Sequence, residues 1–196
     1  MIPALILVLS AVVYRIAAAF LIQSGQASWL GNFAPLAAIA LCGAVYLPPR
    51  FKFSVPLGAL FISDLVLNYL YHAPLVQAQM VSRYLALALV GLIGLALQNR
   101  ASLKTLLPAS IAGSAIFYLI TNAASWLSDP GYAKNFAGLI QSLTMGLPQY
   151  SATPTWMFFR NTLLSDLFFT LAFVACMNFG RNAGRTRAGA ALPRTA

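Results

Sequence analysis

The sequence predicts an all-α, polytopic membrane protein with six transmembrane helices. Hydrophobic residues make up 60% of its 196 residues, charged residues make up only 8%, and the mean hydropathy is +0.79. A soluble domain carries about 25% charged residues. The apolar residues also gather into six stretches that polar, Pro or Gly residues separate from one another. This pattern is typical of a chain that crosses a bilayer several times.

Each stretch is interpreted as one transmembrane helix, because about 17 to 25 apolar residues are needed to cross a bilayer. The first stretch lacks a basic segment before it and a small-residue cleavage motif after it, so we expect a retained helix and not a signal peptide. The second is short and needs flanking residues to complete a crossing. In chain order the stretches are Pro3–Ile22, Phe33–Leu47, Phe53–Tyr71, Val81–Leu97, Leu106–Leu127 and Thr155–Asn178.

The rest of the chain divides into short connections, one longer loop and a tail. The loop, residues 128–154, begins with the turn signal Asp129-Pro130-Gly131 and contains an amphipathic run, Phe136 to Leu147, that is too short to span. We expect this run to lie at the membrane interface or to cover the bundle as a lid. Residues 1–178 then form one transmembrane domain, and residues 179–196 form a basic, disordered tail.

The basic residues predict the orientation of the chain. The net charge is +9, but the Lys and Arg residues lie at the ends of the apolar stretches, so nucleic acid is not an expected partner. Two connections and the tail, which six alternating helices would place on one side, hold most of them. The positive-inside rule therefore puts both termini in the cytoplasm and the tail near anionic lipid headgroups.

The acidic residues are the most informative feature of the chain. There are only three, and two of them, Asp64 and Asp166, lie inside apolar stretches in the same tripeptide, Ser-Asp-Leu. A charged side chain inside a bilayer costs about 2.5 to 3.5 kcal/mol on insertion scales, so it faces protein or water and finds a partner. We expect Arg15, near the middle of the first helix, to balance them. The shared tripeptide also admits an inverted repeat, although no longer similarity accompanies it.

Other polar residues gather toward the same half of the predicted membrane. Every helix contributes one to the centre or the outer half, whereas the inner halves are almost purely apolar. Asn32 is expected to cap the second helix. This distribution predicts a polar cavity that opens to the outside, although a buried cluster that only fixes helix packing would use the same residues. The candidate ligand-binding residues are Arg15, Asn32, Asp64, Asn68, Arg83, Tyr84, Asn122, Trp126, Arg160, Asn161 and Asp166.

Within this cavity we assign roles by residue type. Arg15, Asp64 and Asp166 form the floor, the Asn and Arg residues recognise polar groups of the ligand, and Trp126 and Tyr84 stack on it. The alternative for the tryptophans is an aromatic belt at the membrane interface. With one histidine, His72, and two separate cysteines in predicted helices, we expect no metal site, no disulfide and no bound cofactor.

Enzyme motifs are absent from the sequence. It contains no Gly-x-Ser-x-Gly, His-Glu-x-x-His, Gly-x-x-x-x-Gly-Lys or Cys-x-x-Cys. The chain is therefore not expected to be an enzyme, and any use of ATP would come from another subunit.

Several motifs resemble an uncharacterised bacterial family of six-helix membrane proteins. They are Arg15, the run from Asn32 to Leu41 with Gly43-Ala44, Pro56–Leu65 in the form Pro-Leu-x-Ala-Leu-x-x-Ser-Asp-Leu, Phe117–Asn122 with Trp126, and Phe159–Leu167. That family is in turn similar to the substrate-binding S components of energy-coupling factor (ECF) vitamin transporters. The resemblance implies an S-component-like bundle in the bacterial inner membrane, driven by a transmembrane T subunit and two ATPases.

The function that we expect is capture of a small organic solute at the outer face, as the substrate-binding part of an importer. Two other functions fit the same residues. One is an ion- or proton-coupled permease in which the two intramembrane aspartates titrate. The other is a membrane assembly factor that transports nothing.

Overall fold

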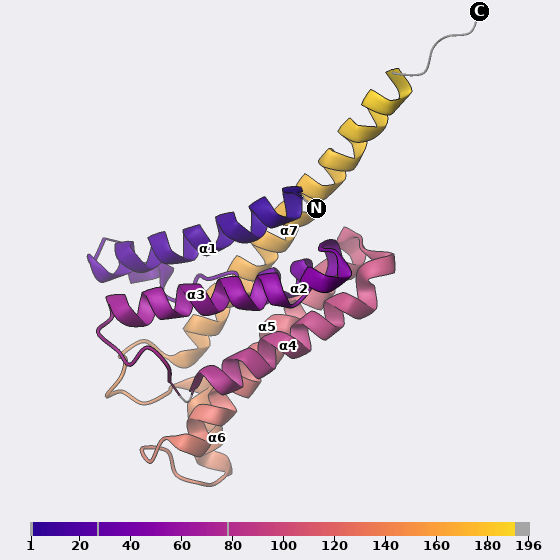
Figure 1. Cartoon of the computed structure of the whole chain (residues 1–196). Coiled ribbons are helices and arrows are strands. Elements are labelled where there is room, and N and C mark those ends of the chain that lie inside the picture. The colour runs from indigo at the N-terminus through magenta and orange to yellow at the C-terminus, as the bar shows by residue number, and fades with distance from the viewer. Residues whose placement is uncertain (1, 27, 78, 191–196) are drawn as a thin grey trace, which may run out of the picture.

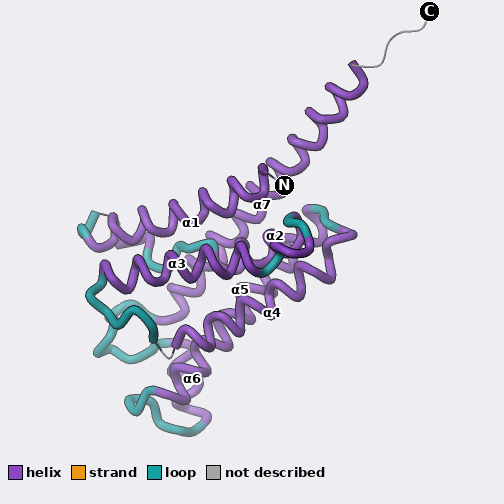
Figure 2. The backbone as a smooth tube through the Cα atoms, in the orientation of Figure 1, coloured by secondary structure: helices purple, strands orange, loops and turns teal. Residues whose placement is uncertain are grey.

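The computed structural model describes residues 2–26, 28–77 and 79–190. These residues form helices and connecting loops, and no strand occurs among them (Figure 2). The α-helices are α1 (Ile2–Gln23), α2 (Leu36–Tyr46), α3 (Ser54–Leu70), α4 (Gln79–Leu97), α5 (Leu103–Ser128), α6 (Phe136–Thr144) and α7 (Thr155–Ala190). Single 3-10 turns, η1 (Ser28–Leu30), η2 (Pro49–Phe51) and η3 (Gln98–Arg100), lie in the connections.

The long helices pack together into a bundle (Figure 1). Five helical stretches are long and apolar enough to cross a membrane: Ile2–Gln23, Pro49–Leu70, Gln79–Arg100, Leu103–Ser128 and Thr155–Gly180. Their length and composition are those of a polytopic membrane protein. The second predicted segment is the exception, because α2 contains only 11 helical residues and is too short to span.

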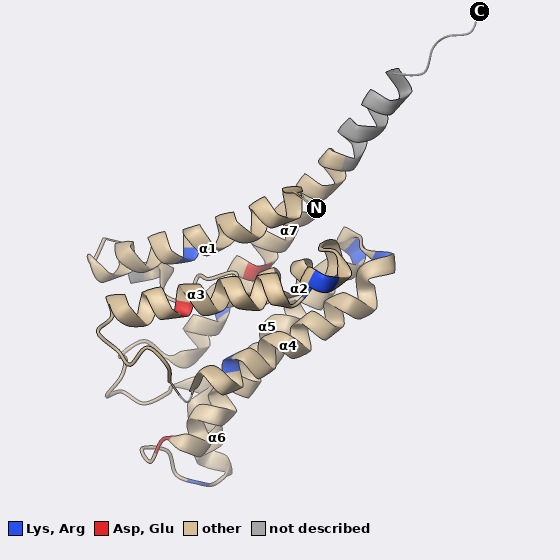
Figure 3. Ribbon diagram, in the orientation of Figure 1, with Lys and Arg blue, Asp and Glu red and all other residues tan. Residues whose placement is uncertain are grey.

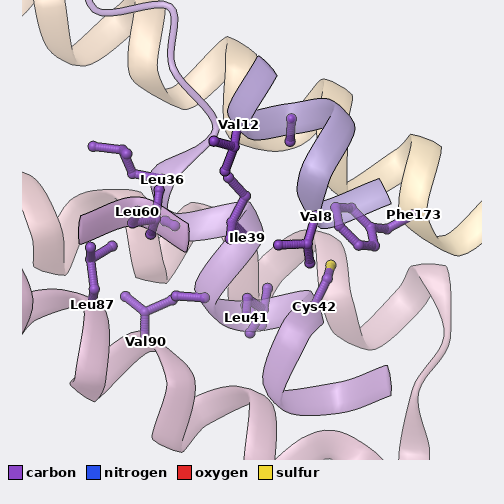
Figure 4. Packing of buried hydrophobic residues seen from close by; sticks show 14 residues of the cluster. Val8, Val12, Leu36, Ile39, Leu41, Cys42, Leu60, Leu87, Val90 and Phe173 are labelled. Carbon is purple, nitrogen blue, oxygen red and sulfur yellow. The ribbon is translucent and has the colours of Figure 1, made fainter. Parts of the chain in front are cut away.

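α2 is the centre of the bundle. Every residue from Leu36 to Val45 is buried, and the helix packs against α1, α3, α4, α5 and α7. A helix that is apolar on all sides is buried on all sides. Figure 4 shows Ile39, Leu41 and Cys42 of α2 in the middle of the core, with Val8 from α1 and Val90 from α4 beside them. The core therefore forms around the shortest of the six predicted membrane segments.

Small residues let the neighbouring helices approach α2 closely. A Cβ atom added to Gly94 of α4 would lie 2.4 Å from the Leu41 carbonyl oxygen, and one added to Gly43 would lie 2.3 Å from Cγ of Pro56 in α3. Contacts this short require glycine, since neither a backbone carbonyl nor a proline ring can move aside as a flexible side chain can. Close approach through small residues is a common mode of helix packing in membranes.

The basic connections lie together at one end of the bundle. Figure 3 shows Lys and Arg at the turn between α2 and α3 and at the turn between α4 and α5. Lys52 of the first turn is buried and donates a hydrogen bond to Gln98 of the second. The alternating topology predicted from the sequence requires this arrangement.

The structure adds to the sequence predictions in two segments, the loop after α5 and the C-terminal tail. The run after Asn135 forms α6, which packs on α5 and α7. Asn135 starts it by accepting a hydrogen bond from the Gly138 amide at 2.9 Å. The tail differs from the disordered segment expected after residue 178, because α7 continues to Ala190. Ala and Arg have high helix propensity, and extending an existing helix needs no new nucleation. Residues 191–196 of that tail lie outside the described residues.

Replacing Gly94 by Ala should destabilise the protein by about 1 to 3 kcal/mol, because α4 must move away from the α2 backbone. Gly58→Ala in α3 is the matched control: no atom lies within 4 Å of its added Cβ, and it should be neutral or stabilise by up to about 1 kcal/mol. Thermal unfolding of the purified protein in detergent measures both. Equal midpoints for the two variants would contradict the close α2–α4 packing.

Candidate functional site

A half-open cavity of about 580 Å³ lies at one end of the bundle. Its walls come from the C-terminal halves of α1, α3 and α5 and from the beginnings of α2, α4 and α7. This is the end opposite the basic turns, which join the other ends of α3 and α4. The candidate residues that line the cavity are Arg15, Asn32, Asp64, Asn68, Arg83 and Asn122.

A cluster of charges forms one wall of the cavity. Arg15 of α1 forms an ion pair with Oδ1 of Asp64 in α3 and also donates to the Ser63 hydroxyl. On the other side, Nη1 of Arg83 in α4 lies 3.0 Å from Oδ2 of Asp64. The Tyr84 hydroxyl donates to the same oxygen at 2.8 Å. Both carboxylate oxygens of Asp64 are therefore bound, by three side chains from two neighbouring helices, α1 and α4.

The two arginines differ in exposure. Arg15 is 9% exposed and Asp64 is 2% exposed, whereas Arg83 is 29% exposed. Burial of an unpaired charge costs several kcal/mol, so the buried Arg15 requires the carboxylate beside it. Arg83 retains access to the cavity, and the guanidinium group has five N–H donors. The wall thus combines a buried ion pair with a more accessible cation.

Aromatic rings form another part of the wall. Tyr118 of α5 and Phe159 of α7 line the cavity, and their ring centroids lie 4.6 Å apart with an interplanar angle of 33°. The Tyr118 hydroxyl donates to the Leu143 carbonyl near the end of α6. α6 thereby holds a ring of the cavity wall, although no residue of the described segment 128–154 lines the cavity. The described residues of the loop therefore do not form the lid over the cavity that the sequence predicted.

Asp166 lies elsewhere, and the expected floor shared by the two aspartates is wrong. Asp166 is fully buried in α7 and does not line the cavity. Its Oδ1 accepts a hydrogen bond from the Ala38 amide in the first turn of α2 at 2.9 Å, and its Oδ2 accepts one from the Ser114 hydroxyl at 2.8 Å. Pro35, at the N-cap of α2, makes no side-chain cap hydrogen bond. The carboxylate of α7 therefore caps α2 from across the bundle.

Asn32 does not cap α2 as the sequence predicted. It has a left-handed backbone with φ of 58° in the turn before the helix, a conformation that Asn tolerates better than most residues, and it lines the cavity. Its backbone carbonyl accepts a hydrogen bond from Thr162 of α7 at 3.1 Å.

Four other candidate residues lie outside the cavity lining. Tyr84 reaches the site only through Asp64. Trp126 donates its indole N–H to the Ala133 carbonyl at 2.8 Å, and so it holds the loop after α5. Asn161 donates to the Trp29 and Gly31 carbonyls at 3.1 and 2.8 Å, which fixes the turn before α2. Arg160 is exposed and contacts Asn161.

The cavity also contains residues that sequence reasoning missed. Most are uncharged amides, hydroxyls and rings near the helix ends, which carry no individual signal in an apolar chain. Ser125 was detectable, because it lies three residues after Asn122 and shares its helix face, and Thr121 lies four residues before Ser125 on the same helix. The missed polar and aromatic residues are Phe33, Tyr71, Gln77, Gln79, Ser82, Phe117, Tyr118, Thr121, Ser125, Thr155, Phe158, Phe159 and Thr162.

The turn after α5 is organised by Asp129. Its carboxylate accepts a hydrogen bond from the Gly131 amide at 2.8 Å. This bond, with a second from the Tyr150 hydroxyl, holds the pKa of Asp129 below its usual range. The two hydrogen bonds therefore stabilise the ionised form of Asp129.

Metal ligands do not gather anywhere in the described part of the chain. No three His, Cys, Asp or Glu side chains there lie close enough to hold an ion together. The chemistry that the cavity offers is binding through charge, hydrogen bonds and ring contacts.

These features define an all-helical protein with five helices long and apolar enough to cross a membrane and with a polar cavity at one end of the bundle. Residues 1–186 match the model of a family of unknown function, DUF6580, and the chain belongs to that family. No curated protein and no solved structure matches the chain. The comparisons therefore confirm membership of an uncharacterised family, and the similarity to ECF S components stays a prediction.

Loss of Asp64 should destabilise the protein more than loss of Arg15, the other buried member of the ion-pair cluster. Asp64→Leu leaves two guanidinium groups facing each other and should cost about 3 to 5 kcal/mol of stability. Arg15→Met should cost less, because Arg83 and Tyr84 still bind Asp64. The double variant should recover part of the loss of Asp64→Leu. Thermal unfolding in detergent tests this order, and equal losses in both single variants would contradict it.

Two replacements of Asp166 should differ in stability, because only one of them keeps an acceptor for the cap on α2. Asp166→Leu removes the acceptor of the Ala38 amide and should cost about 2 kcal/mol or more. Asp166→Asn keeps an acceptor for that amide and a polar partner for Ser114, so it should cost about 1 kcal/mol. Unfolding midpoints of the two variants measure the difference. A cap role is excluded if the Leu and Asn variants are equally stable.

Proposed function

We propose that this protein is the membrane substrate-binding component of an importer for a small, vitamin-like molecule. The observation that supports this proposal best is the cavity of about 580 Å³ that six α-helices share. Small-molecule sites typically enclose about 300 to 1,000 Å³ and combine apolar walls with a few placed polar groups. The aromatic pair and the charged wall supply both kinds of contact.

The arrangement of the chain fits capture from the outer face. In this proposal α2 and the irregular residues before it complete a sixth crossing, and both termini lie in the cytoplasm of a bacterial cell. Non-helical backbone at membrane depth is tolerated where it lines a cavity, and residues 32–34 do line it. The basic turns at the opposite end favour the cytoplasm for that end. The cavity then faces outward.

The energy for transport comes from partners in this proposal. The sequence lacks a phosphate-cradling motif, and similarity to S components implies a transmembrane T subunit with two ATPases. The chain itself binds and delivers the molecule. It performs no covalent chemistry.

The geometry favours binding over an ion-coupled permease. Asp64 is held by two arginines and a tyrosine, and Asp166 by an amide and a hydroxyl. A residue that gains and loses a proton during transport must exchange its partners easily. Both aspartates instead have partners that account for their burial.

Filling the cavity should abolish capture. The full chain is purified from cell membranes in mild detergent, and small molecules that it retains are released by denaturation and identified by mass spectrometry. Ser125→Trp places a large ring in the cavity. Leu119→Trp on the same helix is the control, because Leu119 is 51% exposed and lies outside the cavity lining. We expect a retained molecule in the wild type and in Leu119→Trp, and at least a tenfold loss in Ser125→Trp.

Unfolding midpoints confirm that each variant is folded before the comparison is made. Uptake of the identified molecule by cells that express each variant then follows the same order. The proposal is wrong if the wild type retains no molecule, or if folded Ser125→Trp retains as much as Leu119→Trp.

A further inference from the structure

The charges that line the cavity do not cancel. Of the described residues in its wall, only Arg15, Arg83 and Asp64 are charged, which gives a formal excess of one positive charge. The second intramembrane carboxylate does not correct this excess, because Asp166 caps α2 and lies outside the lining. The cavity therefore offers one more cation than anion.

The excess charge resides on Arg83. Arg15 is the more buried arginine, and its two terminal nitrogens bind Asp64 and Ser63. Arg83 is more exposed and reaches Asp64 through Nη1 alone, at 3.0 Å. Asp64 can stay neutralised by Arg15 when Arg83 turns toward another acceptor. A guanidinium group binds carboxylate and phosphate oxygens in pairs, with fixed geometry.

The surroundings of Arg83 suit an anion that carries a planar body. Gln79 and Ser82, on the same helix, line the cavity with uncharged polar groups. Tyr118 and Phe159 supply a ring surface in the same cavity. Low-dielectric walls strengthen the field of an unbalanced charge inside a cleft.

We propose that the cavity selects a small, water-soluble organic anion, whose carboxylate or phosphate group binds Arg83 while a planar body contacts Tyr118 and Phe159. This inference rests on the proposed function for the role of the cavity. It adds the class of molecule that the cavity accepts.

The sign of the cavity potential is measurable without knowing the ligand. In a background with Cys42 and Cys176 replaced by Ala, Ser82→Cys places one thiol in the cavity wall beside Arg83. Its labelling rates are compared for two methanethiosulfonates, the anionic sulfonatoethyl reagent and the cationic trimethylammonioethyl reagent. The ratio of the two rates cancels the intrinsic reactivity of the thiol. Ala152→Cys, exposed in the loop before α7, is the reference position.

We expect the ratio of anionic to cationic labelling to be about tenfold higher at position 82 than at position 152. Arg83→Gln should remove the difference. Arg160→Gln is the matched control, because it removes an exposed arginine of α7 outside the cavity lining, and it should leave the ratio unchanged. Equal ratios at the two positions, or a ratio that Arg83→Gln leaves unchanged, would overturn the inference.

Two further labelling experiments distinguish the possible occupants of the cavity. Benzoate should slow labelling of Ser82→Cys more than benzamide or benzylamine, which share its ring but are neutral and cationic. Equal protection by all three contradicts an anion site. The labelling is also compared in phosphatidylcholine nanodiscs with and without phosphatidylglycerol. If phosphatidylglycerol alone protects the thiol, a lipid headgroup occupies the cavity and the soluble anion is excluded.

These results are distinguishable from failure of the proposed function. A cavity with positive potential from which no small molecule is recovered contradicts the importer but not the anion site. A recovered molecule that is neutral or cationic contradicts the anion site but not the importer.

Discussion

The fold depends on a helix that begins inside the bundle. α2 has 11 residues, too few to cross a bilayer, and its first turn, Leu36 to Ala38, is buried inside the bundle. Hydrocarbon offers no acceptor for the amides of this turn, and Pro35 before them provides no side-chain cap. Asp166 of α7 supplies the acceptor at Ala38. The most buried helix is thus completed by a side chain from the last helix of the chain.

The late start of α2 also makes the cavity. Because the helix begins at Leu36, the residues before it take an irregular path, and several of them line the space between α1, α4, α5 and α7. The same cap determines the charge of that space. With Asp166 committed to α2, the cavity keeps Asp64 against Arg15 and Arg83. One hydrogen-bond requirement in the core therefore accounts for both the shape and the charge of the site.

The sequence predicted those residues of the candidate site whose charge is costly to bury. Arg15, Asp64 and Arg83 are conspicuous in an apolar chain, and the structure brings them together. Position along a helix also predicted that Asn68 and Asn122 would line the cavity. Roles that depend on side-chain direction were not predictable. Trp126 lies at the right depth, but its indole binds the loop, and the ring surface of the cavity is Tyr118 with Phe159.

The sequence by itself determined the all-helical class, the five helices that are long and apolar enough to cross a membrane, the basic connections and the end of the bundle where polar groups gather. These follow from composition and periodicity, because the cost of burying charge acts on each segment separately. Only the tertiary structure decided how the two Ser-Asp-Leu tripeptides differ. Identical neighbours in sequence cannot specify whether a carboxylate meets an arginine or a helix end. That choice depends on which helices pack together, and so on contacts between residues far apart in the chain.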